Sequence, residues 1–369
     1  MDVTKFPLPS LYKIKKNNMK NIYVSIILMA LLFVSCGHSS KKATIEEPVS
    51  EEALLEQMAE EENLSEFDRT QFVPTLEFPI CSDTNAVYCA TLLFAWDEVC
   101  KIVGTPLSIS DKYHDLKLLN ASTSFRDVLK PGDYKASGEV KGDYIFTRAS
   151  FEKKLPFDYN LRKYEHKLKF DGQKVAAFGV DGDDHEDVKQ IVDILYYKND
   201  KNFMIKLKPT DEEHEIVLFK TEKKYGTMAE MTAAMDSLIQ LGKKERAVSS
   251  KKWKYQFLSE DVVMVPDIDF DISASFDKLV GNVFEANTKT YEILKAWQRT
   301  AFKLDEAGAE VKSEAEVVCV LGIEQEEETK PTPKKMIFDK PFFVMLRRAD
   351  ATNPYFCLYV ANPELLVKE

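Results

Sequence analysis

The chain has 369 residues and a formal net charge of −11 at pH 7. An acidic protein repels the phosphate backbone, so we expect no nucleic-acid partner. Hydrophobic residues make up 44% of the chain and glycines number only 13, which is an ordinary globular composition. The length allows one large domain or two medium ones.

The first 35 residues are predicted to be an export signal. A basic segment with Lys13, Lys15, Lys16 and Lys20 precedes a short apolar run from Ile22 to Val34, and Cys36 follows. The run is too short for a comfortable transmembrane span. The sequence Phe33–Cys36 resembles a bacterial lipoprotein box, which implies that Cys36 becomes the lipidated first residue of the mature protein. A plain signal peptide or a single anchor helix are the alternatives.

A lipid on Cys36 implies that a membrane of the bacterial cell envelope holds the protein, which then faces the periplasm or the surface. Residues 36–65 are predicted to be a polar tether followed by an acidic helix, Glu51–Glu62. Residues 66–369 are predicted to form a single domain.

In the first half of this domain, the sequence predicts one helix and two strands. Thr84–Val103 is broadly apolar and is followed by Gly104 and Pro106, which favours a largely buried helix. Leu116–Phe125 and Tyr144–Phe151 have the composition of strands.

The middle of the domain alternates strands and turns, with one longer helix. Met228–Leu241 is predicted to be a helix because Met231, Met235, Leu238 and Leu241 share one face. Phe276–Gly281 is predicted to be a short helix after a strand. The predicted strands are Val192–Tyr197, Phe203–Lys208, Ile216–Phe219 and Val262–Ser275, and Lys167–Val175 is predicted to form a strand, a turn and a second strand.

The C-terminal part contains a strand, a long polar loop and a hairpin. After Gly308 small residues occupy every second position (Ala309, Val311, Ser313 and Ala315), with charged residues between them. This alternation predicts a strand with one compact and one charged face. An acidic, proline-containing tract follows, and Phe338–Leu346 and Tyr355–Val360 then predict a hairpin.

Three motifs of this C-terminal part resemble the serpin family. Glu306-Ala307-Gly308-Ala309 is similar to the family's hinge, Phe338–Phe343 to the F-x-x-(H/K)-P-F strand, and Val360–Pro363 to the terminal motif. The three motifs stand in the family's order. The resemblance implies an α+β, serpin-like fold, with large mixed or antiparallel sheets, helices packed around them and an exposed reactive-centre-like loop.

The resemblance also implies a mechanism. In the family, the loop is held outside a sheet that lacks one strand, and after cleavage its first half inserts as a new central strand and drags the bound protease along. Insertion requires small or apolar side chains at alternate positions, and Gly308 supplies freedom at the pivot. The hinge residues are therefore Glu306, Gly308, Ala309, Val311, Ser313 and Ala315. The family's usual spacing puts the scissile bond within Val320, Leu321, Gly322 and Ile323.

The sequence departs from the family in its first half and beside the hinge. Only Arg126–Asp143 lies between the two predicted strands, so the helix that crosses the sheet in the family has no counterpart. Gln298 stands where a histidine is usual, and the loop is longer.

Catalytic and metal-binding motifs are not evident. The sequence lacks the nucleophile, P-loop and zinc-protease patterns, so we predict no catalytic residues, no metal site, no cofactor and no enzyme activity. His185 and His214 lie in acidic segments and are expected to be exposed. Cys89 and Cys100 are expected to be buried thiols in a helix, and Cys319 could be reactive.

Two functions follow from these observations. The first is a lipoprotein inhibitor that traps a serine or cysteine protease by insertion of the loop 308–335. The second is a non-inhibitory, serpin-shaped binding module of the cell envelope. Small residues at alternate loop positions favour the first, and the long acidic loop and short N-terminal half favour the second.

Overall fold

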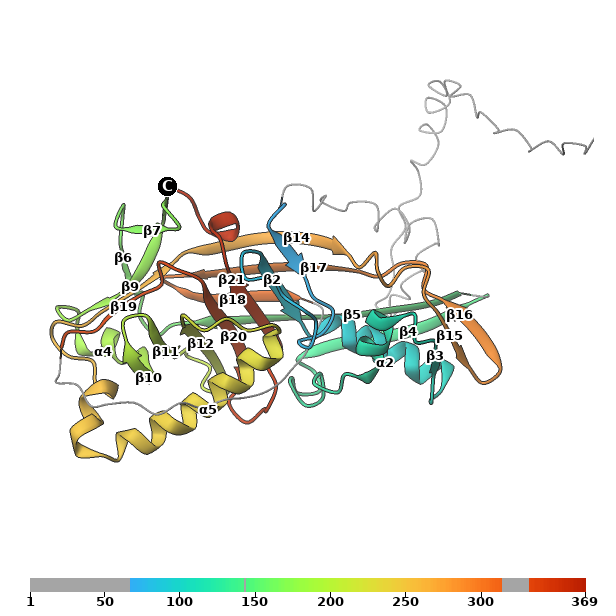
Figure 1. The fold of residues 1–369 in the computed structure, drawn as a ribbon, viewed down its shortest axis with the longest axis horizontal. Helices are drawn as coiled ribbons and strands as arrows, with labels where there is room; N and C mark the ends of the chain where they lie inside the picture. Colours follow the sequence, from blue (N-terminus) through green and yellow to red (C-terminus); the bar gives the residue numbers. More distant parts are fainter. Residues whose placement is uncertain (1–66, 143, 314–331) are drawn as a thin grey trace, which may run out of the picture. The chain divides into compact units, whose positions relative to one another are not determined.

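A computed structural model describes residues 67–142, 144–313 and 332–369 of the chain. These residues belong to one compact unit, Met58–Glu369. They form a mixed α+β fold in which sheets predominate and few helices pack around them (Figure 1). The predicted α+β class is therefore confirmed.

The largest sheet among the described residues has seven strands in the order β1-β2-β21-β20-β12-β11-β10. Only β1 and β2 pair in parallel. Its middle strands are buried on both faces, as the continuous apolar run Phe342–Leu346 predicts. The strand bounds are Thr70–Phe72, Asn85–Cys89, Phe356–Val360, Phe342–Arg348, His214–Lys220, Asn202–Leu207 and Val192–Asn199.

A second sheet has five antiparallel strands in the order β14-β17-β18-β5-β4. Along β14, the side chains of Ile268, Phe270 and Ile272 are buried, while Asp269 and Asp271 are exposed. This alternation is expected for a sheet with one solvated face. The strand bounds are Ile268–Ser275, Trp297–Asp305, Gly308–Ser313, Tyr144–Pro156 and Tyr134–Lys141.

Three smaller sheets complete the strand arrangement of the described part of the chain. Their orders are β19-β13-β9-β6, β16-β15-β3 and β7-β8. The bounds, in chain order from β3, are Ser108–Ile109, Arg162–Lys163, Leu168–Phe170, Gln173–Val175, Ala177–Asp181, Val262–Pro266, Val283–Ala286, Lys289–Glu292 and Lys335–Ile337.

The helices cover the two large sheets (Figure 1). α5 begins at the N-cap Thr227, whose hydroxyl accepts a hydrogen bond from Glu230 N, and the Glu230 carboxylate accepts one from Gly226 N, the residue before the cap. Met231 and Met235 of α5 are buried. The helix bounds are α2 Thr91–Val103, α3 His114–Ala121, α4 Glu186–Lys189, α5 Met228–Arg246, and the 3₁₀ helices η2 Ser249–Tyr255 and η3 Pro363–Leu365.

Aromatic side chains join the two large sheets into one core. Phe302 of β17 packs against Phe356 of β21 with ring centroids 4.5 Å apart, and Phe151 of β5 contacts Tyr355 edge-on at 5.6 Å. Phe94 of α2 stacks on Tyr134 of β4 at 4.2 Å. The five-stranded sheet therefore rests on the seven-stranded sheet near its centre and on α2 near β4.

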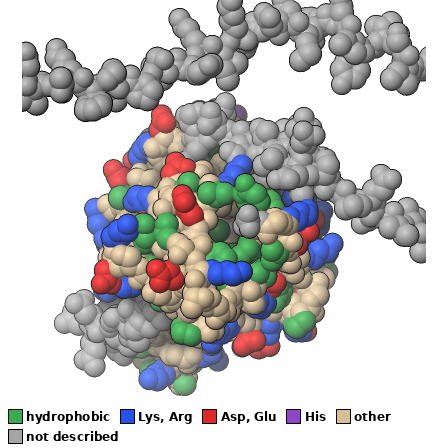
Figure 2. Space-filling view, turned by 90° about the vertical axis from the view of Figure 1, so that its right-hand side faces the viewer, with side chains coloured by type: hydrophobic (Ala, Val, Ile, Leu, Met, Phe, Trp, Pro, Cys, Tyr) green, Lys and Arg blue, Asp and Glu red, His purple; other side chains and the backbone are tan. Residues whose placement is uncertain are grey.

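Figure 2 views the end of the molecule at the right-hand side of Figure 1, where hydrophobic side chains surround a hollow. The tips of the β4–β5 and β15–β16 hairpins lie at this end (Figure 1). Val140 and Tyr144, on either side of the β4–β5 turn, are exposed.

Three secondary-structure predictions were wrong. Thr84–Val103 is not one helix, because Asn85–Cys89 pairs with β1 and β21 as β2 before α2 begins. Leu116–Phe125 is mostly the helix α3, whose Leu116 and Leu119 are buried on one face at helical spacing. Phe276–Gly281 forms turns and no helix.

Val262–Ser275 is not one strand but two, β13 and β14, which belong to different sheets. The other strand predictions that fall on described residues are confirmed, although several boundaries shift. Tyr144–Phe151 is part of a longer strand, β5, and the C-terminal hairpin is β20–β21. Phe338 precedes β20 and packs against Phe203 and Phe342. The acidic helix Glu51–Glu62 lies outside the described residues.

Candidate functional site: the hinge strand and its turn

The predicted hinge forms the central strand of the five-stranded sheet. Gly308–Ser313 is β18, and it pairs with Ala301–Asp305 of β17 on one side and with Phe151–Pro156 of β5 on the other. The resemblance implies a hinge outside the sheet before cleavage, so the structure differs on this point. The physical reason is that both edges of β18 are hydrogen-bonded and its small side chains are buried.

The two faces of β18 have opposite character, as the alternation predicts. Ala309 and Val311 are 4% and 0% exposed. Glu310 and Lys312 lie on the outer face and form ion pairs with Lys154 and Glu152 of β5. Partial burial raises the pKa of Glu310, but Lys154 and Lys312 outweigh it and hold this pKa below its usual value. Small residues inside and paired charges outside suit a strand in the middle of a one-sided sheet.

Gly308 is required by the close approach of β18 to β5. Its φ is +141°, and a Cβ at this position would lie 2.4 Å from the carbonyl oxygen of Leu155. A side chain therefore collides with backbone that is fixed in a strand.

The turn that joins β17 to β18 is fastened by backbone hydrogen bonds. Ala307 N donates to Asp305 Oδ1, Leu161 N donates to Glu306 O, and Phe157 N donates to Ala307 O, all at 2.9 Å. The Glu306 carboxylate forms an ion pair with Lys163 of β6 through Oε1 at 2.9 Å. The turn is thereby connected to the segment that follows β5.

A second carboxylate, Asp267, lies at the same turn. It immediately precedes β14, and the pairing of Ile268 with Leu304 places it across from Asp305. Oδ1 of Asp267 and Oε2 of Glu306 are both buried without a hydrogen-bond partner. Burial first, and then the negative charges of Glu306 and Asp305, raise the pKa of Asp267 to about 6.

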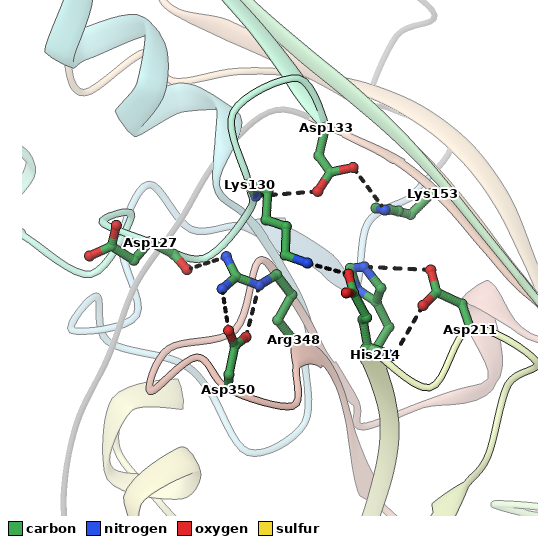
Figure 3. A network of polar contacts seen from close by, with 9 residues as sticks. Asp127, Lys130, Asp133, Lys153, Asp211, His214, Arg348 and Asp350 are labelled. Carbon is green, nitrogen blue, oxygen red and sulfur yellow. Dashed lines mark hydrogen bonds and ion pairs between the residues drawn. The ribbon is translucent and has the colours of Figure 1, made fainter.

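A polar network lies beneath β5, close to the inner face of β18 (Figure 3). Lys153 pairs in register with Val311 and forms an ion pair with Asp133 at 3.0 Å. The nearby His214, at the start of β12, hydrogen-bonds to the hydroxyl of Tyr355 at 3.1 Å. On the other side of the network, Arg348 binds Asp350 and the backbone oxygen of Asp127.

The expectation that His214 is exposed was wrong. It is 3% exposed because β12 carries it under β5, against Tyr355. Burial lowers the pKa of His214, and the Lys153 ammonium lowers it further. His214 is therefore a neutral core side chain at neutral pH.

Gln298, which replaces the family's usual histidine, is fully buried in β17. Its Nε2 donates to Thr300 Oγ1 at 2.7 Å. This residue thus contributes hydrogen bonds and no titratable charge to the middle of the sheet.

The segment that follows the loop is fixed by a buried ion pair. Lys334 Nζ lies 2.5 Å from Asp261 Oδ2, and both side chains are 0% exposed. Lys334 N also donates to Asp261 Oδ1, and Leu258 N donates to Asp261 Oδ2. The ammonium lies 5.6 Å from the centre of the Trp253 ring. β19 therefore begins directly after a firmly held residue.

Several predicted site residues lie outside the described residues. They are the hinge residue Ala315, the candidate scissile region Val320, Leu321, Gly322 and Ile323, the thiol Cys319 and the lipidation site Cys36. Of the described cysteines, Cys81 and Cys100 are free thiols. Cys89 lies in β2 rather than in the predicted helix, while Cys100 lies in α2.

Neither a metal cluster nor a spanning helix is found in the described part of the chain. No group of three or more His, Cys, Asp or Glu side chains there could hold a metal ion. Likewise, no helix among residues 67–142, 144–313 and 332–369 is long and apolar enough to cross a membrane.

Sequence reasoning missed Asp267, Lys153 and the Asp261–Lys334 pair. The alternation of Asp267, Asp269 and Asp271 is visible in the sequence. However, only the pairing of β14 with β17 shows that Asp267 reaches the hinge turn. Lys334 lies in a Pro-Lys-Lys segment, a composition typical of exposed residues, so the sequence gives no sign that its side chain is completely buried.

No protein-family model and no curated protein matches this sequence. Similar solved structures include cleaved Serpin 42Da and a Manduca sexta serine protease inhibitor (serpin), with TM-scores of 0.31 and 0.32. A loop-inserted, cleaved ovalbumin mutant has a TM-score of 0.35 and covers 73% of this chain. All three are 10% identical to it, and the chain spans between 54% and 65% of their length. Function is therefore inferred from the placement of β18 itself.

Proposed function

We propose that this protein is a lipid-anchored inhibitor that traps a serine or cysteine protease by insertion of the loop 308–335. The observation that carries this proposal is β18. Its six residues are hydrogen-bonded between β17 and β5, with Ala309 and Val311 in the core. The sheet thus accepts the first six residues from Gly308 as a central strand.

The trapping step begins as ordinary proteolysis. The hydroxyl or thiol of the protease attacks the scissile carbonyl within Val320–Ile323, the C–N bond breaks, and the amine leaves as a new N-terminus. The other half of the loop stays covalently bound to the protease as an acyl-enzyme. If β18 then extends beyond Ser313, each added residue gains hydrogen bonds on both sides, and the bound protease moves with it.

The two halves of the cleaved loop would differ in how they are attached to the rest of the domain. The first half continues directly from β18, and cleavage would cut its covalent link to β19. The second half ends at Lys334, which is held by Asp261 in the core. Cleavage would therefore release one side of the loop and leave the other attached to β13 through β19.

A non-inhibitory binding module of the cell envelope is the second candidate function. β18 already occupies the centre of the sheet in the uncleaved chain, so part of the stabilisation from insertion is already present. Under this alternative, cleavage of the loop changes little, and the protein acts by contact with a partner.

A melting experiment separates the two functions. The full-length chain, in non-ionic detergent, is melted before and after limited proteolysis between Val317 and Glu328. The inhibitory function predicts that Tm rises by more than ten degrees after cleavage, because new strand pairing forms. An unchanged Tm would favour the binding module.

A protease panel then tests trapping directly. We expect one or more serine or cysteine proteases to form a covalent complex with the protein that survives denaturing electrophoresis. Complete cleavage without any complex, by every protease that cuts the loop, would contradict the inhibitory function.

A further inference from the structure

The turn between β17 and β18 contains two buried carboxylate oxygens that make no hydrogen bond, Asp267 Oδ1 and Glu306 Oε2. A carboxylate can only accept hydrogen bonds, so the proximity of two such groups is unfavourable when both are charged. A proton on Asp267 removes one charge and turns an acceptor into a donor. We propose that binding of a proton to the Asp267–Glu306 pair fastens this turn, so that β18 is held in the sheet more firmly in acid than at neutral pH.

The surroundings of the pair determine its response to protonation. The charged groups that face Asp267 are Glu306 and Asp305 of the turn, Lys163 of β6 and Lys303 of β17. Lys163 binds the other oxygen of Glu306, and Lys303 binds Asp305 at 2.6 Å. Both lysines are more than half exposed, so water screens them. The two cations therefore do not neutralise the buried oxygens.

The backbone keeps Asp267 at the turn. Its N–H donates to Ala176 O, and its carbonyl accepts from Val367 N, both at 2.9 Å. Asp267 cannot move away from Glu306 without breaking these bonds. Glu306 belongs to the turn itself, so it moves when β18 leaves the sheet.

The sign of the effect follows from proton linkage. With β18 docked, the pKa of Asp267 is raised from 3.8 to about 6. When β18 leaves the sheet, Glu306 departs, water enters and this pKa returns toward 3.8. Between these values the docked state binds more protons, so acid favours docking. For a single group with these two pKa values, the equilibrium constant for docking of β18 in the sheet is about tenfold larger at pH 5 than at pH 8.

Hydrogen exchange measured by mass spectrometry tests this proposal without any protease, so its outcome is independent of the inhibitory function. The full-length chain in non-ionic detergent is exchanged at pH 5 and at pH 8, and rates are corrected for the intrinsic pH dependence of exchange. We expect the protection of peptides from Ala309–Ser313 to be about tenfold greater at pH 5. β11, in the other large sheet, serves as the internal control and should not respond in this way.

Three variants complete the design. Asp267→Asn should abolish the pH response of β18, and Glu306→Gln should reduce it. Asp269→Asn, which changes an exposed side chain of β14, should leave the pH response of β18 unchanged. The proposal is overturned if β18 of the unaltered protein responds less than twofold, if β11 responds equally, or if Asp267→Asn retains the tenfold response.

Discussion

At the scale of single residues, the core-facing side of β5 carries charge where apolar residues are the rule. Lys153 lies between Phe151 and Leu155 on this side and is neutralised by Asp133. The consequence for its neighbour His214 is a lowered pKa, because a second cation would be buried near the first. The network therefore favours the neutral form of His214.

This arrangement predicts an acid-sensitive contribution to stability from His214. The folded-state pKa lies below the unfolded value of 6.5, so the unfolded chain binds the extra proton as pH falls. The free energy of unfolding should therefore decrease as pH drops below about 6.5. His214→Gln, which cannot titrate, should lack this component in urea denaturation at several pH values.

Asp267 contributes with the opposite sign, since its folded pKa is raised to about 6. Its stabilising effect is complete below 3.8 and is lost as pH rises to about 6. The difference between the unaltered protein and His214→Gln isolates the histidine from this opposing effect. An identical pH dependence of the two proteins would contradict the assignment.

At the scale of elements, β18 is the strand on which the proposed function depends. Its inner face carries the small side chains of Ala309 and Val311, and its outer face carries Glu310 and Lys312. Burial of a charged side chain without a partner is costly, whereas an exposed charge is nearly neutral. Substitutions on the two faces should therefore differ sharply in effect.

If the protein traps proteases as proposed, we expect Val311→Lys to convert it from an inhibitor into a substrate. The new ammonium would enter the core beside Lys153, so the hinge strand could not stay in the sheet, and cleavage would no longer trap the protease. Covalent complex formation should fall at least tenfold while cleavage continues. Glu310→Lys adds the same side chain on the outer face and should retain most of the trapping. Equal loss in both variants would show that the face of the strand is not decisive.

The Asp261–Lys334 pair is the corresponding element on the other side of the loop. Removal of one partner from a buried pair leaves an uncompensated charge, which costs about 3–5 kcal/mol. Lys334→Met should therefore lower the free energy of unfolding by about this amount, as measured by chemical denaturation. The matched control is Lys335→Met, an exposed neighbour in β19, for which we expect a change below about 0.5 kcal/mol. Similar values for the two variants would contradict the assigned role of the pair.

At the scale of the whole molecule, we propose separate tasks for the domain and its N-terminal segment. The described residues form the sheets that position the hinge, while Cys36 is proposed to attach the chain to the membrane. Attachment would confine the inhibitor to proteases that reach the cell envelope.

Metabolic labelling with a fatty acid tests the anchor. The unaltered protein should incorporate the label, and Cys36→Ser should not, because lipidation requires the thiol of that residue. Cys81→Ser removes an exposed free thiol of the domain and should leave the labelling intact. Absence of label from the unaltered protein would leave a plain signal peptide or an anchor helix as the explanation.

The sequence by itself determined the local elements with strong patterns. The alternation after Gly308, the turn between β7 and β8 and the methionine face of α5 all appear in the structure. Secondary-structure prediction from local sequence patterns failed where pairing with strands distant in sequence determined the structure. Asn85–Cys89 forms a strand because β1 and β21 lie on either side of it. The leucines of α3 have helical spacing, but the apolar run that contains them is too short to distinguish a helix from a strand.

Only the tertiary structure decided the environment of the hinge. β18 lies between strands from distant parts of the chain, Asp267 reaches the turn through the pairing of β14 with β17, and His214 is buried by Tyr355. These are contacts between residues far apart in sequence, and no local periodicity encodes which strands become neighbours. The sequence thus indicated which residues could insert, whereas the fold determined where they lie and which charges surround them.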